Sequence, residues 1–397
     1  MPADKTDLFS EVASIDYPII DADAHVNEPP DLWQTRVPQK WRERAPKVLR
    51  TEHGDVWSFD DGKRLRPLGL TAAAGQSFLD FRPAGLRYEE IRAGSFDTKA
   101  RLADLDIDGI AAQVLYPSVT LTGAALYAEE RELQRVCVRA YNEWLLEFCE
   151  GSAGRLIPQA ILPTTGLKDS IEELEWAVEH GHKGVVISAF PNGSLDPSPD
   201  DEPFWALAEQ TGAPIAVHIG SFQKESAGGG GRTLDMQSLA FLGLAGATKA
   251  GASTLPVVST LLFADIFERH PGVKCVLVEA NIGWIPTLLE QIDDMFLRYR
   301  FFTKAVERMK RMPSALFHQS FWATFMIDTV GMELRHRLNL DHVMYSTDYP
   351  HTGCDWPNSR TVIERVFRGI PKDQVRKMLC DNARTLYQLD RLPEPPR

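Results

Sequence analysis

Residues 17–25 read Tyr-Pro-Ile-Ile-Asp-Ala-Asp-Ala-His, an apolar run that turns into acidic and imidazole side chains alternating with alanine. Because side chains alternate along a strand, Asp21, Asp23 and His25 would all point to one side of it. Residues 27–30 (Asn-Glu-Pro-Pro) follow at once and predict a loop. A buried strand that ends in potential metal ligands is typical of the rim of a parallel barrel. An isolated Asp-x-His can also simply cap a strand end, so the interpretation depends on the rest of the chain.

Seven more short apolar runs follow, separated by stretches with helical spacing of apolar residues, such as 128–150 and 169–180. Eight strand–helix units predict a (β/α)8 TIM-type barrel of the α/β class that occupies residues 1–397 as a single domain. An open doubly wound sheet is the alternative, but no Gly-x-Gly-x-x-Gly follows the first strand, where a dinucleotide-binding fold needs it. The further strands are predicted at residues 109–116, 156–162, 184–189, 214–219, 274–280, 321–327 and 342–348.

Three stretches are too long to be plain connections, and one of them, residues 291–319, carries a basic cluster that is typical of a solvated helix face. Residues 30–97, after the first strand, are rich in Trp, Arg and Pro and predict a cap insertion over the barrel mouth; a packing arm for a neighbouring subunit is the alternative. Pairing through such a cap makes a homodimer the expected assembly. Residues 221–269, after the fifth strand, predict a lid or helical insertion. They contain the glycine run 228–231 followed by Arg232, which suits either closure over an anionic substrate or an ordinary loop.

Composition narrows the classes of function. A formal net charge of −12 without a basic stripe argues against a nucleic-acid partner, so a small-molecule substrate is expected. No apolar run approaches the roughly 20 residues of a membrane-spanning helix, and the amino terminus lacks a signal pattern. We therefore expect a cytoplasmic protein without a membrane partner. The five cysteines lie far apart and form no C-x-x-C pair, which argues against a disulfide framework and a thiolate zinc site.

Polar residues gather at the predicted carboxyl ends of the strands, the rim where barrel enzymes carry their chemistry. A charged side chain that ends a buried strand is costly to desolvate unless a partner such as a metal ion offsets that cost. The pattern therefore predicts a metal site. The candidate ligands are Asp23, His25, His218, Asp348 and Glu279, with Glu28 and His351 as weaker candidates.

The same rim carries a family resemblance. The Asp-x-His of the first strand, residues 279–286 (EANIGWIP) and residues 345–351 (YSTDYPH) resemble the amidohydrolase-related branch that includes aminocarboxymuconate semialdehyde decarboxylase and the resorcylate decarboxylases. The resemblance extends over nearly the whole chain. It implies one divalent ion, zinc or manganese, and either decarboxylation or hydrolysis of a small carboxylic-acid substrate, with the metal polarising a substrate oxygen or activating water. The implied ligands are Asp23, His25, His218 and Asp348.

The chain departs from that family in two places. Its first-strand pair, Asp23 and His25, is richer in oxygen than two histidines, which favours manganese or iron over zinc. The family has a histidine as general acid or base after the sixth strand, where this chain has Glu279. A carboxylate there can move protons if the pocket raises its pKa, and it can also bind a second metal ion.

Glu279 therefore separates two functions. As a proton carrier, with His218 and Asp348 as the other catalytic candidates, it leaves one metal in the site and supports a decarboxylase or hydrolase. As a ligand it makes room for two irons, which suits a nonheme diiron monooxygenase on the same barrel acting on a CoA-linked acid. A metal-binding protein without catalysis is the third reading, and the decarboxylase or hydrolase is the one we expect.

Overall fold

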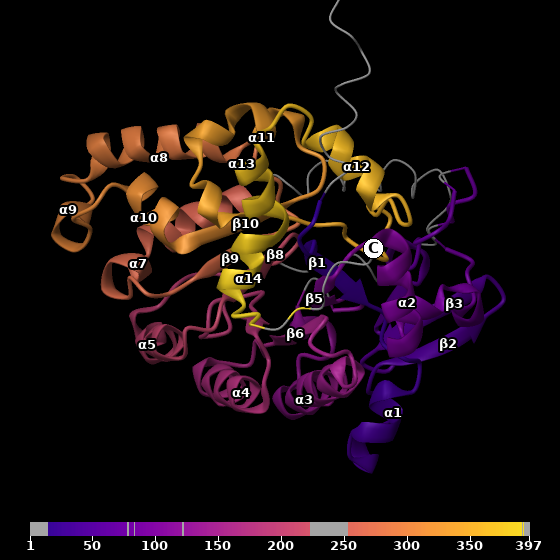
Figure 1. The fold of residues 1–397 in the computed structure, drawn as a ribbon. Helices are drawn as coiled ribbons and strands as arrows, with labels where there is room; N and C mark the ends of the chain where they lie inside the picture. Colours follow the sequence, from indigo (N-terminus) through magenta and orange to yellow (C-terminus); the bar gives the residue numbers. More distant parts are fainter. Residues whose placement is uncertain are drawn as a thin grey trace, which may run out of the picture.

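The computed structural model describes residues 15–77, 79–82, 84–120, 123–222, 253–390 and 392. Eight parallel strands form one sheet in the order β1-β5-β6-β7-β8-β9-β10-β11, so each strand pairs with the next barrel strand along the chain (Figure 1). The predicted TIM-type barrel is confirmed. Its strands are β1 (Ile20–Val26), β5 (Ala112–Pro117), β6 (Leu156–Ile161), β7 (Gly184–Val186), β8 (Ile215–His218), β9 (Cys275–Val278), β10 (Phe321–Phe325) and β11 (Val343–Tyr345).

The strands are short and almost entirely buried, as expected of parallel strands covered on both faces. Two predicted strands extend furthest beyond the observed carboxyl ends, by three residues each: 184–189 ends at Val186 and 342–348 ends at Tyr345. In the second case the backbone nitrogen of Ser346 still donates to the Phe325 carbonyl of β10 at 2.9 Å, and the residues after Ser346 turn to β1. The backbone nitrogen of Asp348 donates to the Asp23 carbonyl at 2.9 Å, and that of His25 donates to the Tyr349 carbonyl at 2.6 Å. These bonds close the barrel.

Amphipathic helices surround the strands and bury their apolar stripes against the barrel. Within α3, for example, Leu133, Cys137, Tyr141 and Phe148 are buried at helical spacing. None of the described helices is long and apolar enough to cross a membrane. The main helices are α2 (Thr98–Asp108), α3 (Arg131–Cys149), α4 (Leu167–His180), α5 (Glu202–Thr211), α7 (Ile266–Arg269), α8 (Ile285–Tyr299), α9 (Ala305–Arg308), α10 (Pro313–Ser320), α11 (Thr329–Leu334), α12 (Ser359–Val366), α13 (Lys372–Arg376) and α14 (Asn382–Leu386).

The insertion between β1 and β5 contains α1 (Leu32–Arg36) and a three-stranded antiparallel sheet, β2 (Lys47–Thr51), β3 (Gly54–Phe59) and β4 (Arg64–Pro67). Figure 1 shows this sheet beside α2, at the edge of the barrel. The backbone nitrogens of Ala73 and Ala74 donate to the Pro350 carbonyl at 2.8 and 3.1 Å, so the insertion rests on the loop after β11. Its role as a cap stays a prediction. The glycine run and Arg232 of the second predicted insertion lie outside the described residues.

Candidate metal centre

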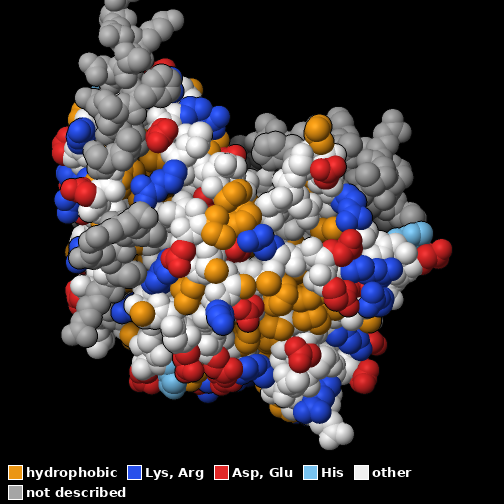
Figure 2. Space-filling view, turned by 45° about the vertical axis from the view of Figure 1, so that its right-hand side comes forward, with side chains coloured by type: hydrophobic (Ala, Val, Ile, Leu, Met, Phe, Trp, Pro, Cys, Tyr) orange, Lys and Arg blue, Asp and Glu red, His pale blue; other side chains and the backbone are white. Residues whose placement is uncertain are grey.

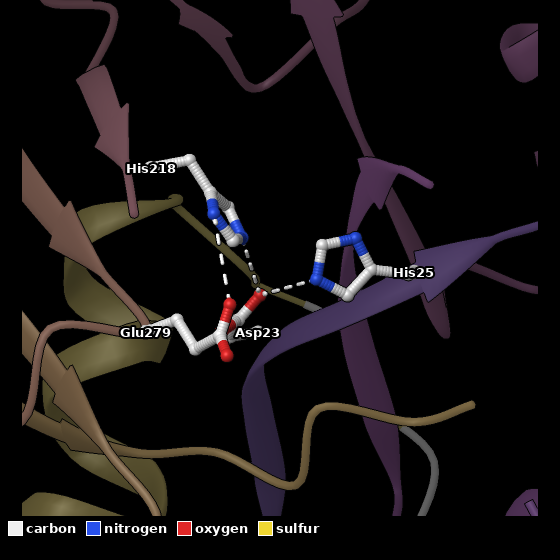
Figure 3. Close-up of side chains that lie close together, drawn as sticks. All are labelled: Asp23, His25, His218 and Glu279. Carbon is white, nitrogen blue, oxygen red and sulfur yellow. Dashed lines mark ion pairs between the residues drawn. The ribbon is translucent and has the colours of Figure 1, made fainter. Parts of the chain in front are cut away.

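Four side chains from three parts of the barrel converge at the carboxyl-end rim. Asp23 and His25 lie on the same side of β1, His218 ends β8, and Asp348 follows β11. The Nε2 atom of His25 lies 3.3 Å from Asp23 Oδ1 and 3.3 Å from Asp348 Oδ1, and His218 Nε2 lies 3.5 Å from Asp23 Oδ1. Figure 3 shows both imidazoles turned toward the Asp23 carboxylate. At most 3% of any of these side chains is exposed.

Hydrogen bonds behind the rings fix their orientation. His25 donates through Nδ1 to the Pro117 carbonyl at 3.0 Å, which leaves Nε2 as the atom that faces the cluster. The His351 ring stacks on the His25 ring with 3.7 Å between centroids. Its Nδ1 lies 3.1 Å from Asp348 Oδ1, and its Nε2 lies 3.0 Å from Ser118 Oγ. His351 thus connects the cluster to the end of β5.

Glu279 occupies the edge of the cluster that faces outward. It follows β9 directly, and its Oε2 atom lies 3.9 Å from His218 Nδ1 (Figure 3). Its side chain is 21% exposed, whereas that of His218 is 1% exposed. A carboxyl group at this place can contact both the buried cluster and a molecule that enters from the rim.

The prediction that Asp21 faces the same side of β1 as His25 is wrong. A bulge lies between Asp21 and Ala24, so Asp21 pairs with Gln113 whereas His25 pairs with Tyr116, which lies on the opposite face of β5. Asp21 stabilises the fold instead. Its carboxylate accepts hydrogen bonds from the backbone nitrogen and the hydroxyl of Thr347 and from Gln113 Nε2, the first and last at 2.9 Å. Burial raises the pKa of Asp21 to about 7. The residue ties β1 to the loop that carries Asp348, and so helps to hold two candidate ligands together.

The ionisable groups of the cluster shift one another's pKa values. Burial alone would raise the pKa of Asp23, but the imidazoles of His218 and His25 more than offset it and hold that pKa well below its usual value. Burial alone would lower the pKa of His25, but the carboxylates of Asp23 and Asp348 raise it to about 10. Burial raises the pKa of Glu279 well above its usual value, and the charges of Asp348 and Asp23 add to this effect. The electrostatic environment of the cluster therefore stabilises a positive charge.

The donor atoms of the cluster fit a divalent cation. Buried polar atoms in proteins nearly always have a hydrogen-bond partner, and leaving one without costs roughly 1–3 kcal/mol. Two carboxylates and two imidazoles form a ligand set that Mn²⁺, Fe²⁺ and Zn²⁺ accept. The buried atoms of the cluster that have no hydrogen-bond partner are Asp23 Oδ1 and Oδ2, His25 Nε2, His218 Nε2 and Asp348 Oδ1.

The structure brings six of the seven predicted ligands into two groups that share His25. Ligand atoms within each group lie within 4.8 Å of one another. Glu28 lies in neither: it is fully buried, accepts a hydrogen bond from the Val119 nitrogen at 3.3 Å, and burial raises its pKa to about 8. The first group is Asp23, His25, His218 and Glu279, and the second is His25, Asp348 and His351.

Two residues of the site escaped the sequence analysis. Ser118 directly follows β5, so its place at a strand end was a usable signal. Thr347 was inside a predicted strand, where a hydroxyl carries no signal of its own. Its bond to Asp21 joins residues that are 326 positions apart.

Comparison with known proteins identifies the relatives of this barrel. A family model described as amidohydrolase matches residues 20–389. No curated protein matches the sequence significantly. Among solved structures, an amidohydrolase of Mycobacterium avium subsp. paratuberculosis K-10 matches with a TM-score of 0.74 and 19% identity, over 94% of this chain and 100% of the other.

Two solved decarboxylases are also similar. A dihydroxybenzoic acid decarboxylase from Polaromonas sp. JS666 with bound manganese matches with a TM-score of 0.60 and 17% identity, over 94% of this chain and 98% of the other. A 5-carboxyvanillate decarboxylase from Novosphingobium aromaticivorans DSM 12444, also with bound manganese, matches with a TM-score of 0.63 and 15% identity, over 94% of this chain and 97% of the other. At these identities the likeness concerns the fold.

Proposed function

Because the chain belongs to the amidohydrolase family, we propose that it is a metal-dependent enzyme that removes carbon dioxide from a small carboxylic acid. Membership of this family identifies the chain as an enzyme. Hydrolysis of such a substrate is the second candidate, because the family description names that reaction. The observation that supports the proposal most directly is the convergence of buried carboxylate and imidazole atoms that have no hydrogen-bond partner at the barrel rim.

We assign Asp23, His25, His218 and Asp348 as the residues that would hold one divalent ion. The mixture of carboxylate and imidazole ligands favours manganese, iron or zinc, and two similar decarboxylases contain manganese. A bound ion would supply a positive charge that holds a substrate carboxylate or a neighbouring oxygen and stabilises negative charge there.

Glu279 is assigned as the residue that moves the proton. In decarboxylation the bond between the carboxylate carbon and its neighbour breaks, carbon dioxide leaves, and the electron pair stays on the neighbouring carbon. The Glu279 carboxyl would donate its proton to that carbon and regain one from solvent, which its partial exposure permits. Two of the solved structures similar to this chain are decarboxylases, which supports decarboxylation as the first candidate.

The other cluster residues orient this chemistry. The Pro117 carbonyl holds His25 so that Nε2 faces the ligand position, and Ser118 holds His351 beside Asp348. The deep burial of Asp23 and His25 excludes water from their side of the cluster. None of the relatives reported above adds support for the diiron monooxygenase.

Carbon dioxide release from a panel of acids tests the proposal. The manganese-loaded protein would be mixed with dihydroxybenzoic acids and 5-carboxyvanillate, with and without dioxygen. Formation of carbon dioxide at the same rate in both atmospheres, and its loss in Glu279→Gln, is the expected result. Product formation that requires dioxygen would contradict decarboxylation and support the monooxygenase.

A further inference from the structure

We propose that Thr324 and Asp328 are positioning residues that hold the backbone of residues 279–283, and thereby aim the Glu279 side chain at the cluster. This inference rests on the proposed function, because it takes Glu279 as the residue that moves a proton. Thr324 lies on β10, and among the described residues this strand supplies no member of the two ligand groups. Its contribution to the site would be the placement of a neighbour.

Thr324 holds the start of the loop that follows β9. It is fully buried, and its hydroxyl oxygen accepts a hydrogen bond of 2.8 Å from the backbone nitrogen of Glu279. β9 ends at Val278, and Glu279 has a φ of +57°, in the left-handed region that residues other than glycine seldom adopt. A side chain of the adjacent strand therefore fixes the backbone at the turn, where pairing between the strands has ended.

Asp328 holds the other end of the same loop. One carboxylate oxygen, Oδ2, accepts hydrogen bonds from the backbone nitrogens of Ile282 and Gly283, both at 2.7 Å. The other oxygen, Oδ1, accepts from the nitrogen of Gly331 at 2.8 Å and so caps α11. One carboxylate thus joins the loop after β9 to the first turn of α11.

The contact between loop and helix is too close for larger side chains. A Cβ atom on Gly283 would lie 2.8 Å from Asp328 Oδ1, and one on Gly331 would lie 2.4 Å from Ile282 Cγ1. Glycine at both positions lets the two backbones approach closely. The loop between Glu279 and Gly283 therefore packs tightly against the start of α11.

The placement of Glu279 depends on this packing of the loop. Within the described part of the chain, no hydrogen bond reaches its carboxyl group, and the Nδ1 atom of His218 lies 3.9 Å from its Oε2 atom. The position from which the side chain extends is therefore set by the backbone, and no hydrogen bond to the carboxyl group compensates for a displacement of that backbone. A displacement of about 1 Å can reduce a catalytic rate about 100-fold, so the hydroxyl of Thr324 acts on the reaction through Glu279.

The test compares Thr324→Val, which keeps the shape but removes the hydroxyl, with Thr324→Ser, which keeps the hydroxyl. Ser320→Ala is the matched control, because Ser320 is buried just before β10 and its hydroxyl has no hydrogen-bond partner. Amide hydrogen exchange of peptides covering residues 279–284 is measured by mass spectrometry, together with bound manganese. The turnover number and KM are measured with 5-carboxyvanillate and the dihydroxybenzoic acids.

We expect Thr324→Val to exchange about tenfold faster in residues 279–284, as the loss of one hydrogen bond predicts. Its manganese content and KM should stay as in the wild type while turnover falls, and Thr324→Ser should restore both exchange and turnover. Unchanged exchange in Thr324→Val would overturn the positioning role, whatever the activity. Full activity of Glu279→Gln would instead overturn the proton-carrying role in the proposed function, so the two failures are distinguishable.

Discussion

The backbone nitrogen of Asp348 donates a hydrogen bond of 2.9 Å to the carbonyl oxygen of Asp23. This bond joins the loop after the last strand to the first strand. It also brings the two carboxylates to the same nitrogen of His25, since Nε2 lies 3.3 Å from Oδ1 of each. The contact that closes the barrel therefore assembles the candidate metal site as well.

Glu279→Gln should lower the rate of decarboxylation about 100-fold and leave the bound metal in place. The amide keeps the shape of the side chain but cannot donate a proton to carbon and regain it. Glu290→Gln, on the exposed face of α8, is the control and should behave as the wild type. Turnover and metal content are measured on the same preparations. A variant that loses metal would make Glu279 a ligand, and a fall from two irons to one would support the monooxygenase.

Arg101→Leu should destabilise the protein by about 3 kcal/mol, because it removes a buried charged group whose partners stay behind. The guanidinium is fully buried and donates to the carbonyls of Gly94 and His25, each at 2.5 Å, and to the Gln113 amide oxygen at 3.0 Å. Urea unfolding measures the change. Lys99→Leu, an exposed position on the same helix, is the control. Equal stability of Arg101→Leu and the wild type would refute this account of the β1–α2 contact.

Acid should weaken the fold partly through His182. Burial lowers its pKa from 6.5 to about 4, while its Nε2 atom bonds to the Asn142 carbonyl at 3.1 Å. Between these two pKa values the unfolded chain binds more protons than the folded one, so this contribution to stability is lost as pH falls below 6.5. The expected loss at about pH 5 is roughly 2 kcal/mol.

Urea unfolding of the wild type and of His182→Gln between pH 8 and pH 5 measures this contribution. The difference in free energy of unfolding between the two proteins should change by roughly 2 kcal/mol, because the wild type loses more stability on acidification. His180→Gln is the control, because His180 is exposed at the end of α4. Parallel pH profiles for the wild type and His182→Gln would contradict the assignment.

The barrel and the residues at its rim could be predicted from the sequence, because the patterns that indicate them lie within short segments. Each strand is a short apolar run, and the candidate ligands follow such runs directly, as His218 and Glu279 do. The residues at which the strands end were harder to predict. Thr347 and Asp348 lie in a predicted strand, yet they turn to β1, because their bonds to Asp21 and Asp23 exist only in the closed barrel.

The supporting residues depend on contacts between distant parts of the chain. Arg101 lies 76 positions from His25, whose carbonyl it binds, and Thr324 lies 45 positions from Glu279. An arginine in an amphipathic helix or a threonine in a strand has many ordinary roles. Their importance follows only from the packing of α2 and β10 against the rim.

Metal content per chain is the most direct test of the central claim. Wild type, His218→Ala and the exposed-histidine control His180→Ala would be purified without chelator or added metal and analysed by elemental mass spectrometry. The account predicts about one manganese, iron or zinc per wild-type and control chain, and at least about tenfold less in a folded His218→Ala. Equal metal content in wild type and His218→Ala, or no divalent metal in the wild type even after incubation with Mn²⁺, Fe²⁺ or Zn²⁺, would contradict it.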